Sequence, residues 1–394
     1  MKLLEDILVI DFSQFLSGPS ASLRLADMGA RVIKIEKPGE GDICRQLYVS
    51  DIKIAGESTI FHAINRNKES YVADLKDPAD LEKIKSLLTR ADVMMHNFRP
   101  GVMERIGLDY ETVLGINPAI IYAEITGYGS EGPWKDLPGQ DLLLQAASGL
   151  TWLSNNNYEG PTPMGVAVVD IMAGTHITQG ILAALYKKAT NGKGALVQVS
   201  MLESVLDFQF EVLTCFYNDG NELPVRSGVN SGHAYVAAPY GIYKTKDDYI
   251  ALAMTNILLL ADLLGCEPLK KYANPGEWFQ QRDEIKKILA DHLVNQPAAH
   301  WLEILEKAGV WCADVMDYDA LVKEEGYQVL DMEMNVYTGN GLTIKTTRCP
   351  LHVDDELLLS SAGAPLLGEH TAEIDQEFGL LKDRQPLLKS GMQR

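Results

Sequence analysis

The first half of the chain alternates short apolar runs with stretches of helical periodicity, and this alternation limits the possible folds most strongly. Strands that alternate with helices form βαβ units, so their sheet is mostly parallel. Ligands bind such sheets beyond the carboxyl ends of the strands. We expect an α/β fold with strands at 7–11, 31–36, 71–74, 93–96, 120–125 and 195–200, and helices at 20–28, 78–89, 141–149, 171–186 and up to about 216.

The character of the sequence changes near residue 218, where polar residues with Gly and Pro predict a linker over 218–235. Beyond it, a smaller α+β domain is expected at 236–329. Strand-like, Gly-rich sequence returns after residue 330. The expected large domain therefore consists of residues 1–217 and 330–394. The small domain should have strands at 240–243 and 249–254 and helices at 257–264, 280–293 and 298–308.

Asp170 follows the apolar run at 165–169, which predicts a buried strand, and precedes a helical pattern that starts at Ile171. At such a junction the free N–H groups and the dipole of the helix favour a negative charge. Aspartate is a common helix N-cap, so capping is one interpretation. An ionised, positioned carboxylate can also act as a nucleophile. The residues alone leave both interpretations open.

Composition narrows the class of protein. Of the 394 residues, 46% are hydrophobic and 23% charged, as in soluble globular proteins, and the formal net charge of −19 disfavours nucleic acid or membrane as a partner. The five cysteines form no CxxC pair, which disfavours a metal site and suits a reducing cytosol. The first residues lack a signal-peptide pattern, and no apolar run approaches the roughly 18 residues of a membrane span. We expect a cytoplasmic location.

A literal GxGxxG pattern lies at 127–132, after a predicted strand. A dinucleotide fingerprint must also open a helix, whereas Pro133 and Trp134 continue this segment as a loop, so a nicotinamide site is disfavoured. After the strand at 93–96, Asn97 could bind a ligand by hydrogen bonds and Phe98 could stack on a flat ring. Ordinary loop residues are the alternative explanation for both.

Several segments together resemble the class III CoA-transferase family, which includes formyl-CoA, carnitine and acetyl-CoA:oxalate CoA-transferases. They occur in one order and cover nearly the whole chain. The matching segments are 11–13 with Gly18-Pro19, 25–30 with 32–36, Asn97-Phe98-Arg99-Pro100-Gly101, 127–129 with 132–133, Gly139-Gln140-Asp141, Asp170 with Gly174, and Leu367-Gly368-Glu369-His370-Thr371.

The resemblance implies a Rossmann-like large domain built from both chain ends, a smaller central domain and an interlocked homodimer. It implies that Asp170 is the nucleophile and that Gln140 and Asp141 flank the thioester. Acyl-CoA and a small carboxylic acid would be substrates, with no permanently bound cofactor. Lys37 and Arg105 would contact phosphates. The other implied CoA contacts are Leu16, Ser17, Ala73, Asp74, Leu75, Lys76, Asn97 and Phe98.

Two departures and two alternatives remain. The stretch at 226–233 lacks the glycine run of formyl-CoA transferases, so formyl-CoA specificity is not expected. Leu16 stands where those enzymes place a glutamine, which disfavours the same small polar acceptor. The α-methylacyl-CoA racemases also resemble this chain, but they use a histidine at the position of Gln140, and a glutamine cannot exchange a proton. A CoA-binding regulatory protein without catalysis is the third hypothesis. Ser231, His233 and Tyr235 are candidates for the acceptor pocket.

Overall fold

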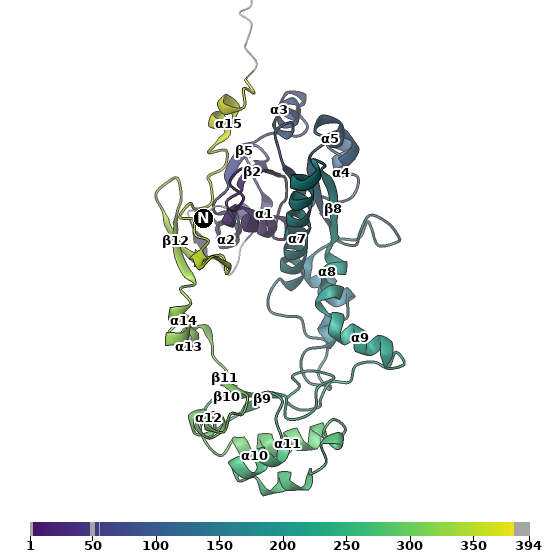
Figure 1. Cartoon of the computed structure of the whole chain (residues 1–394), viewed down its shortest axis with the longest axis vertical. Coiled ribbons are helices and arrows are strands. Elements are labelled where there is room, and N and C mark those ends of the chain that lie inside the picture. The colour runs from purple at the N-terminus through teal and green to yellow at the C-terminus, as the bar shows by residue number, and fades with distance from the viewer. Residues whose placement is uncertain (1–2, 48–51, 55, 382–394) are drawn as a thin grey trace, which may run out of the picture. The chain divides into compact units, whose positions relative to one another are not determined.

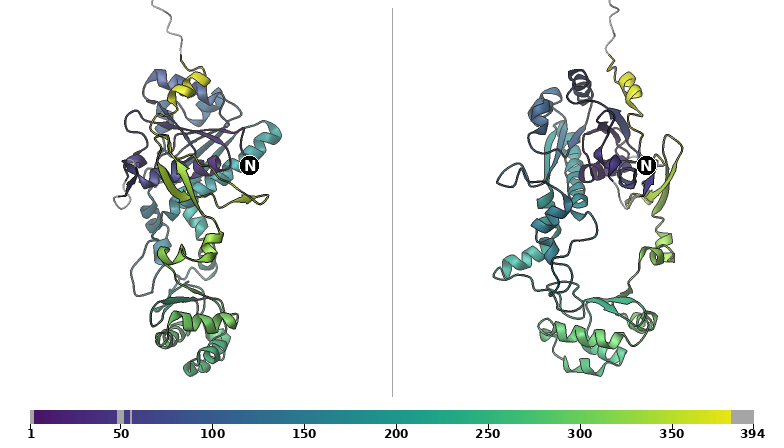
Figure 2. Two further views of the ribbon diagram at one scale, coloured as in Figure 1. Left: turned by 90° about the vertical axis from the view of Figure 1, so that its left-hand side faces the viewer. Right: turned by 180° about the vertical axis from the view of Figure 1, so that it is seen from behind.

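The computed structural model describes residues 3–47, 52–54 and 56–381. Contacts between Cα atoms divide the chain into unit 1, residues 1–139, 170–201 and 332–394, and unit 2, residues 140–169 and 202–331. The chain leaves unit 1 for unit 2 and returns twice, first over 140–169 and then over 202–331 (Figures 1 and 2). The predicted domains differ from this division, because they assign 140–169 and 202–217 to the large domain. Residues 382–394 of the predicted returning segment lie outside the described residues.

Unit 1 contains a six-stranded parallel sheet with the order β5-β2-β1-β6-β7-β8, which confirms the expected α/β fold. Its strands are β1 (Leu8–Asp11), β2 (Arg31–Glu36), β5 (Glu69–Val72), β6 (Val93–His96), β7 (Ile121–Thr126) and β8 (Ala195–Ser200). The helices are α1 (Ser17–Asp27), α2 (Thr59–Asn65), α3 (Pro78–Leu88), α4 (Val102–Ile106), α5 (Tyr110–Ile116), α7 (Val168–Asn191) and α15 (Thr371–Glu377). Short pairs β3 (Lys53–Ile54) with β4 (Glu57–Ser58), β12 (Glu333–Tyr337) with β13 (Thr343–Thr347), β14 (His352–Val353) with β15 (Glu356–Leu357), and the 3-10 helix η1 (Ile43–Gln46) complete it.

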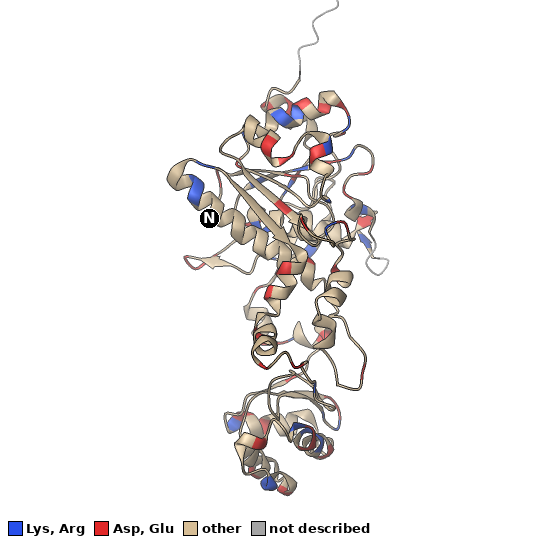
Figure 3. Ribbon diagram, turned by 90° about the vertical axis from the view of Figure 1, so that its right-hand side faces the viewer, with Lys and Arg blue, Asp and Glu red and all other residues tan. Residues whose placement is uncertain are grey.

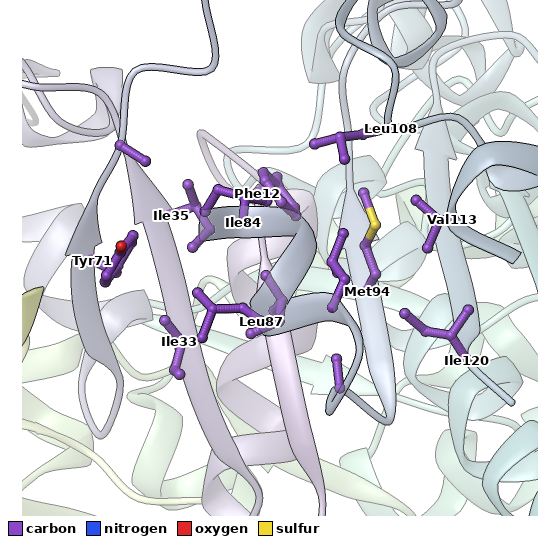
Figure 4. Packing of buried hydrophobic residues seen from close by; sticks show 14 of the residues in the cluster. Phe12, Ile33, Ile35, Tyr71, Ile84, Leu87, Met94, Leu108, Val113 and Ile120 are labelled. Carbon is purple, nitrogen blue, oxygen red and sulfur yellow. The ribbon is translucent and has the colours of Figure 1, made fainter. Parts of the chain in front are cut away.

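One face of this sheet packs against α3, α5 and α15. Strand residues Ile10, Ile33 and Met94 join Leu87 and Val113 of the helices in one buried apolar cluster (Figure 4). The alternating side chains of the strands supply this face. α3 begins where the sequence signals a start: Asp77 accepts a hydrogen bond from the N–H of Ala79 at 2.8 Å, and Pro78 follows it.

Helix α7 packs closely through glycines. A Cβ atom at Gly180 would lie 2.5 Å from Cγ1 of Val197 in β8, and one at Gly174 would lie 2.8 Å from the carbonyl oxygen of Ser17 in α1. By length and hydropathy α7 could cross a membrane, which the sequence prediction missed. A helix in the core of a water-soluble domain passes the same test, and the contacts of α7 with α1 and β8 are of that kind.

The terminal segment around Gly368 and His370 covers the edge strand β5. Nδ1 of His370 accepts a hydrogen bond from the N–H of Ser70 at 3.2 Å, and Oγ1 of Thr371 accepts one from the N–H of Val72 at 3.0 Å. These are alternate residues of an edge strand, whose N–H groups point away from the sheet. The motif therefore satisfies the outer N–H groups of the sheet.

Unit 2 contains an antiparallel sheet with the order β11-β10-β9, packed by Tyr243, Ile250 and Leu252 against a helical layer. Its elements are α6 (Asp141–Ala147), η2 (Leu150–Trp152), α8 (Met201–Phe208), α9 (Phe210–Asn218), β9 (Gly241–Lys244), β10 (Tyr249–Leu252), α10 (Ile257–Leu264), η3 (Glu267–Lys271), η4 (Pro275–Glu277), α11 (Arg282–Leu293), α12 (Ala298–Lys307), β11 (Cys312–Asp314), α13 (Tyr318–Leu321) and α14 (Glu325–Val329).

The predicted strand at 165–169 is wrong. Residues 161–167 form no helix or strand, Val166 is 60% exposed, and α7 begins at Val168. Asp170 is therefore the third residue of α7 and does not lie between a strand and a helix. The predicted helix up to about residue 216 is also two helices, because α8 and α9 are separated at Gln209.

Candidate active site

The strand order of unit 1 reverses between β1 and β6, where the chain continues from β1 towards β2 on one side and from β6 towards β7 on the other. Ligands of open α/β sheets bind at this kind of switch point, beyond the carboxyl ends of the strands. Here the loops after β1 and β6 are joined by one side chain. Asn97 accepts a hydrogen bond from the N–H of Gln14 at 2.8 Å and donates one to its carbonyl oxygen at 2.7 Å.

Buried charged side chains hold the loop after β1 in place. Lys34 donates to the carbonyl oxygen of Ser13 at 2.7 Å and pairs with Asp42 at 2.8 Å, and both of these charged side chains are fully buried. Asp11 accepts hydrogen bonds from the N–H and hydroxyl of Ser13. Burial opposes the charge of Asp11, but the neighbouring Lys34 and Lys68 hold the pKa of its carboxyl below the usual value. The loop therefore rests on a paired ionic network.

Gly18 is required by the same loop. A Cβ atom at this position would lie 2.2 Å from the Cβ of Ser13, a distance that real side chains do not adopt. The first turn of α1 can approach the loop only because residue 18 has no side chain. Leu16 holds the N-cap position of α1 and provides no side-chain cap. The side chain at the cap therefore accepts no hydrogen bond from the backbone N–H groups of this first turn.

His96, the last residue of β6, is a neutral positioning group. The N–H of Phe98 donates to Nδ1 at 3.3 Å, and Tyr122 donates its hydroxyl to the carbonyl oxygen of Leu108 at 2.9 Å. The remaining contact, 3.0 Å between Nε2 of His96 and the oxygen of Tyr122, must then use the proton on Nε2. Burial lowers the pKa of His96 to about 4. The neutral ring fixes the backbone at Phe98.

Glu36 ends β2 at the position where dinucleotide enzymes place the acid that binds a ribose. Its carboxylate is buried and already accepts two hydrogen bonds from Arg45, at 2.8 and 2.6 Å, and one from Ser70 at 2.6 Å. The GxGxxG segment follows β7 as a loop, and the N–H of Gly129 donates to Oγ1 of Thr126 at 3.0 Å. Both observations agree with the low expectation of a nicotinamide site.

Most of the residues implied as CoA contacts in unit 1 follow strands or lie at the start of α1, so they lie along one edge of the sheet, whereas Arg105 belongs to α4. Ser17 is buried in the first turn of α1, and Ala73 follows β5 and donates its N–H to the carbonyl oxygen of Glu36 at 3.0 Å. Lys37 follows β2, is 59% exposed and pairs with Glu40. Arg105 is exposed in α4. The loop after β5 carries Asp74, Leu75 and Lys76.

Asp170 lies one helical turn before Gly174, and residues four apart share one face of a helix. Gly174 contacts Ser17 and Ser20 of α1. Asp170 therefore belongs to the face of α7 that meets the first turn of α1, about 6 Å along the helix axis from that contact. It also lies in the first turn of a helix, where the dipole favours its ionised form.

In unit 2, Asp141 binds the start of α7. Its Oδ1 accepts a hydrogen bond from the N–H of Val169 at 2.7 Å, and its Oδ2 accepts one from Gln145 at 2.6 Å. Gln145 also accepts a hydrogen bond from the N–H of Met164 at 2.9 Å. Gln145 was missed in the sequence, because only the folded chain brings it to 164–169. Gln140 is an exposed N-cap residue of α6.

The acceptor candidates Ser231 and Tyr235 both belong to unit 2. The N–H of Ser231 donates to Oδ1 of Asn156 at 3.0 Å, and the N–H of Tyr235 donates to Nδ1 of His233 at 3.1 Å. The hydroxyl oxygens of Ser231 and Tyr235 are buried and have no hydrogen-bond partner among the described residues. Such unsatisfied hydroxyls are costly unless a ligand or water binds them.

Lys and Arg are interspersed with Asp and Glu in the view of Figure 3. The described residues contain no group of three or more His, Cys, Asp or Glu that could hold a metal ion.

Residues 4–371 match the family model described as CoA-transferase family III. The chain belongs to CoA-transferase family III.

Relatives within this family have different acyl groups in their names. The chain is 37% identical to an acetyl-CoA:oxalate CoA-transferase of Acetobacter aceti, over 79% of this chain and 80% of the relative. It is 32% identical to the succinyl-CoA:glutarate CoA-transferase of Homo sapiens, over 100% of this chain and 90% of the relative. A CAIB/BAIF family protein from Brucella suis has a similar crystal structure, with a TM-score of 0.81 and 26% identity over 94% of this chain and 98% of that one. The family predicted from the sequence is confirmed.

Proposed function

We propose that this protein transfers CoA from an acyl-CoA donor to an acceptor carboxylic acid through covalent intermediates on Asp170. The Asp170 carboxylate attacks the thioester carbonyl, so that a mixed anhydride forms and CoA thiolate leaves. The thiolate attacks the aspartyl carbonyl, so that an aspartyl-CoA thioester forms and the donor acid leaves. The acceptor carboxylate attacks this thioester and expels CoA thiolate, so that a second mixed anhydride forms. The thiolate then attacks the acceptor-derived carbonyl of this anhydride, which releases the new acyl-CoA and regenerates the Asp170 carboxylate. Two anhydride steps thus replace one difficult exchange.

The observation that carries this proposal is the place of Asp170 in the first turn of α7, beside the first turn of α1. Each step develops an oxyanion, which needs preorganised N–H donors. The start of α1 has no side-chain cap, so the N–H groups of Ser17 and Gly18 are candidates for this role. The Gly129 N–H, another candidate, already donates to Thr126.

The racemase alternative is not favoured, because Gln140 provides no group that exchanges a proton. For the acceptor, we propose that the buried hydroxyls of Ser231 and Tyr235 donate to its carboxylate, since both lack partners among the described residues. The donors and acceptors named in the relatives, acetyl-CoA with oxalate and succinyl-CoA with glutarate, define the substrates to test first.

We further propose that the protein acts as a cytoplasmic homodimer. Support for a second copy comes from α9. This helix has no buried residue, and its large side chains Phe210 and Tyr217 are 68% and 64% exposed. Exposed apolar side chains of this kind mark interaction surfaces. Support for the cytoplasm comes from five cysteines that are all unpaired.

Trapping tests the nucleophile. After incubation with acyl-CoA and no acceptor, hydroxylamine should convert Asp170 into its hydroxamate, which peptide mass spectrometry locates. Asp170→Asn should abolish both the label and turnover, whereas the Asp77→Asn control should keep them, because Asp77 only caps α3. A label on another residue, or full activity of Asp170→Asn, would exclude this mechanism.

A further inference from the structure

Phe15 adopts a conformation that a phenylalanine rarely has. Its φ is 63°, in the left-handed region, and its side chain is 47% exposed. An L-residue pays roughly 1–2 kcal/mol in this region, and strained residues of this kind persist only where the surrounding structure holds them. The ring itself is half in solvent, so core packing does not explain the conformation.

Polar contacts at Phe15 and at the two residues before it hold it in place. Its own N–H donates to Oδ1 of Asp42 at 3.2 Å. The preceding Gln14 is bound at both N–H and carbonyl oxygen by Asn97, and Ser13 is bound by Lys34. Asp42 and Lys34 form a buried ion pair. The loop therefore presents an apolar ring at the switch point of the sheet through contacts that do not involve the ring.

The ring lies close in sequence to the part of α1 that α7 contacts. Phe15 precedes Ser17 by two residues, and Ser17 contacts Gly174, one turn after Asp170. A second exposed apolar side chain, Ile43 at 50%, follows the Asp42 anchor directly. Phe15 and Ile43 thus provide exposed apolar side chains in the segments next to the first turn of α1, and an apolar surface suits a hydrocarbon chain.

We propose that Phe15 is a specificity-determining residue, whose ring forms an apolar wall that favours acyl groups with a hydrocarbon chain over shorter ones. This inference rests on the proposed function of Asp170. It predicts that each methylene of the acyl chain gains affinity through contact with the ring, and that two methylenes together gain roughly tenfold.

Binding to Asp170→Asn tests this without turnover. Isothermal titration calorimetry of acetyl-CoA and butyryl-CoA should give dissociation constants that differ by roughly tenfold. In Asp170→Asn with Phe15→Asn the two constants should become equal within about twofold, because Asn tolerates the left-handed conformation and keeps the loop but has no apolar ring. Tyr186→Ala in place of Phe15→Asn is the matched control, since Tyr186 is 75% exposed near the far end of α7.

Two results would overturn the proposal. One is an unchanged ratio of the two dissociation constants in Phe15→Asn. The other is an equal weakening of both ligands, which would mean that the ring contacts the shared CoA part. Failure of the proposed function would differ from either, because it would appear as absent turnover or a label elsewhere in the protein with native Phe15.

Discussion

The carboxylate of Asp141 accepts a hydrogen bond from the backbone N–H of Val169 at 2.7 Å. Val169 is the second residue of α7, so a different aspartate, Asp141, accepts the hydrogen bond of the N–H group next to Asp170. Helix capping and nucleophilic attack were two interpretations of one residue. In the structure, Asp141 makes the capping hydrogen bond with the N–H of Val169, and Asp170 lies inside the first turn of the helix.

We expect Asp141→Ala to lower the free energy of unfolding by about 1 kcal/mol, the usual cost of losing an N-terminal cap, and also to lower kcat, because the start of α7 carries Asp170. Urea unfolding and steady-state kinetics measure the two effects. Asp77→Ala removes a comparable cap from α3 and should cost similar stability with unchanged kcat. If kcat is the same in both variants, Asp141 has no role in positioning Asp170 for the reaction.

Asn97→Ala should raise the KM for acyl-CoA. The substitution leaves the N–H and carbonyl oxygen of Gln14 without their partner, a loss of about 1–3 kcal/mol that loosens the loop at the switch point. Asn117→Ala is a matched control, because Asn117 also binds two backbone carbonyls, those of Leu88 and Ala91, away from the loop. If both variants change only stability and not KM, Asn97 has no role in substrate binding.

Because of His96, we expect the free energy of unfolding to decrease in mild acid. Its pKa is about 4 in the folded protein against an ordinary value of 6.5, so the unfolded chain takes up a proton first as the pH falls. Glu124, 3.6 Å from Nε2, does not reverse this effect of burial. The contribution of the neutral ring is present above pH 6.5 and decreases by roughly 3 kcal/mol between pH 6.5 and 4. The difference in unfolding free energy between the native protein and His96→Asn should shrink over this range, and a constant difference would contradict the prediction.

Ser231→Ala and Tyr235→Phe each remove one buried, unpaired hydroxyl. If these groups bind the acceptor carboxylate, each variant should raise the KM for the acceptor severalfold and leave the KM for acyl-CoA unchanged. Tyr318→Phe, which alters an exposed tyrosine, should change neither constant. An unchanged acceptor KM in both variants would place the acceptor site elsewhere.

Local pattern predicted the elements of the sheet well. The predicted strands at 31–36, 93–96 and 195–200 have the bounds of β2, β6 and β8, and the helix at 257–264 has those of α10. The run at 165–169 failed because a short apolar segment has no period that separates a buried strand from an exposed loop and a helix start. Val166 is exposed and Val169 is buried in the first turn of α7.

The contacts within the site could not be predicted from the local sequence pattern, because they join residues far apart in the chain. Asn97 is 83 residues from Gln14, and Asp141 is 28 residues from Val169. The family resemblance pointed to Asp170, Asn97 and Gln140, but it could not show that Asp141 binds the start of α7. The strained backbone of Phe15 was missed as well, since nothing in its neighbours requires a left-handed residue at that position.

The covering of β5 by His370 and Thr371 has a consequence for how the protein is made. The N–H of Ser70 donates to His370, which lies 300 residues later in the chain. During synthesis on the ribosome, all of unit 2 and the returning hairpins emerge before this segment does. The edge of the nascent sheet stays open for that time, and an open edge can pair with another chain. A segment translated about 300 residues after β5 is therefore the one that covers this edge against pairing with another chain.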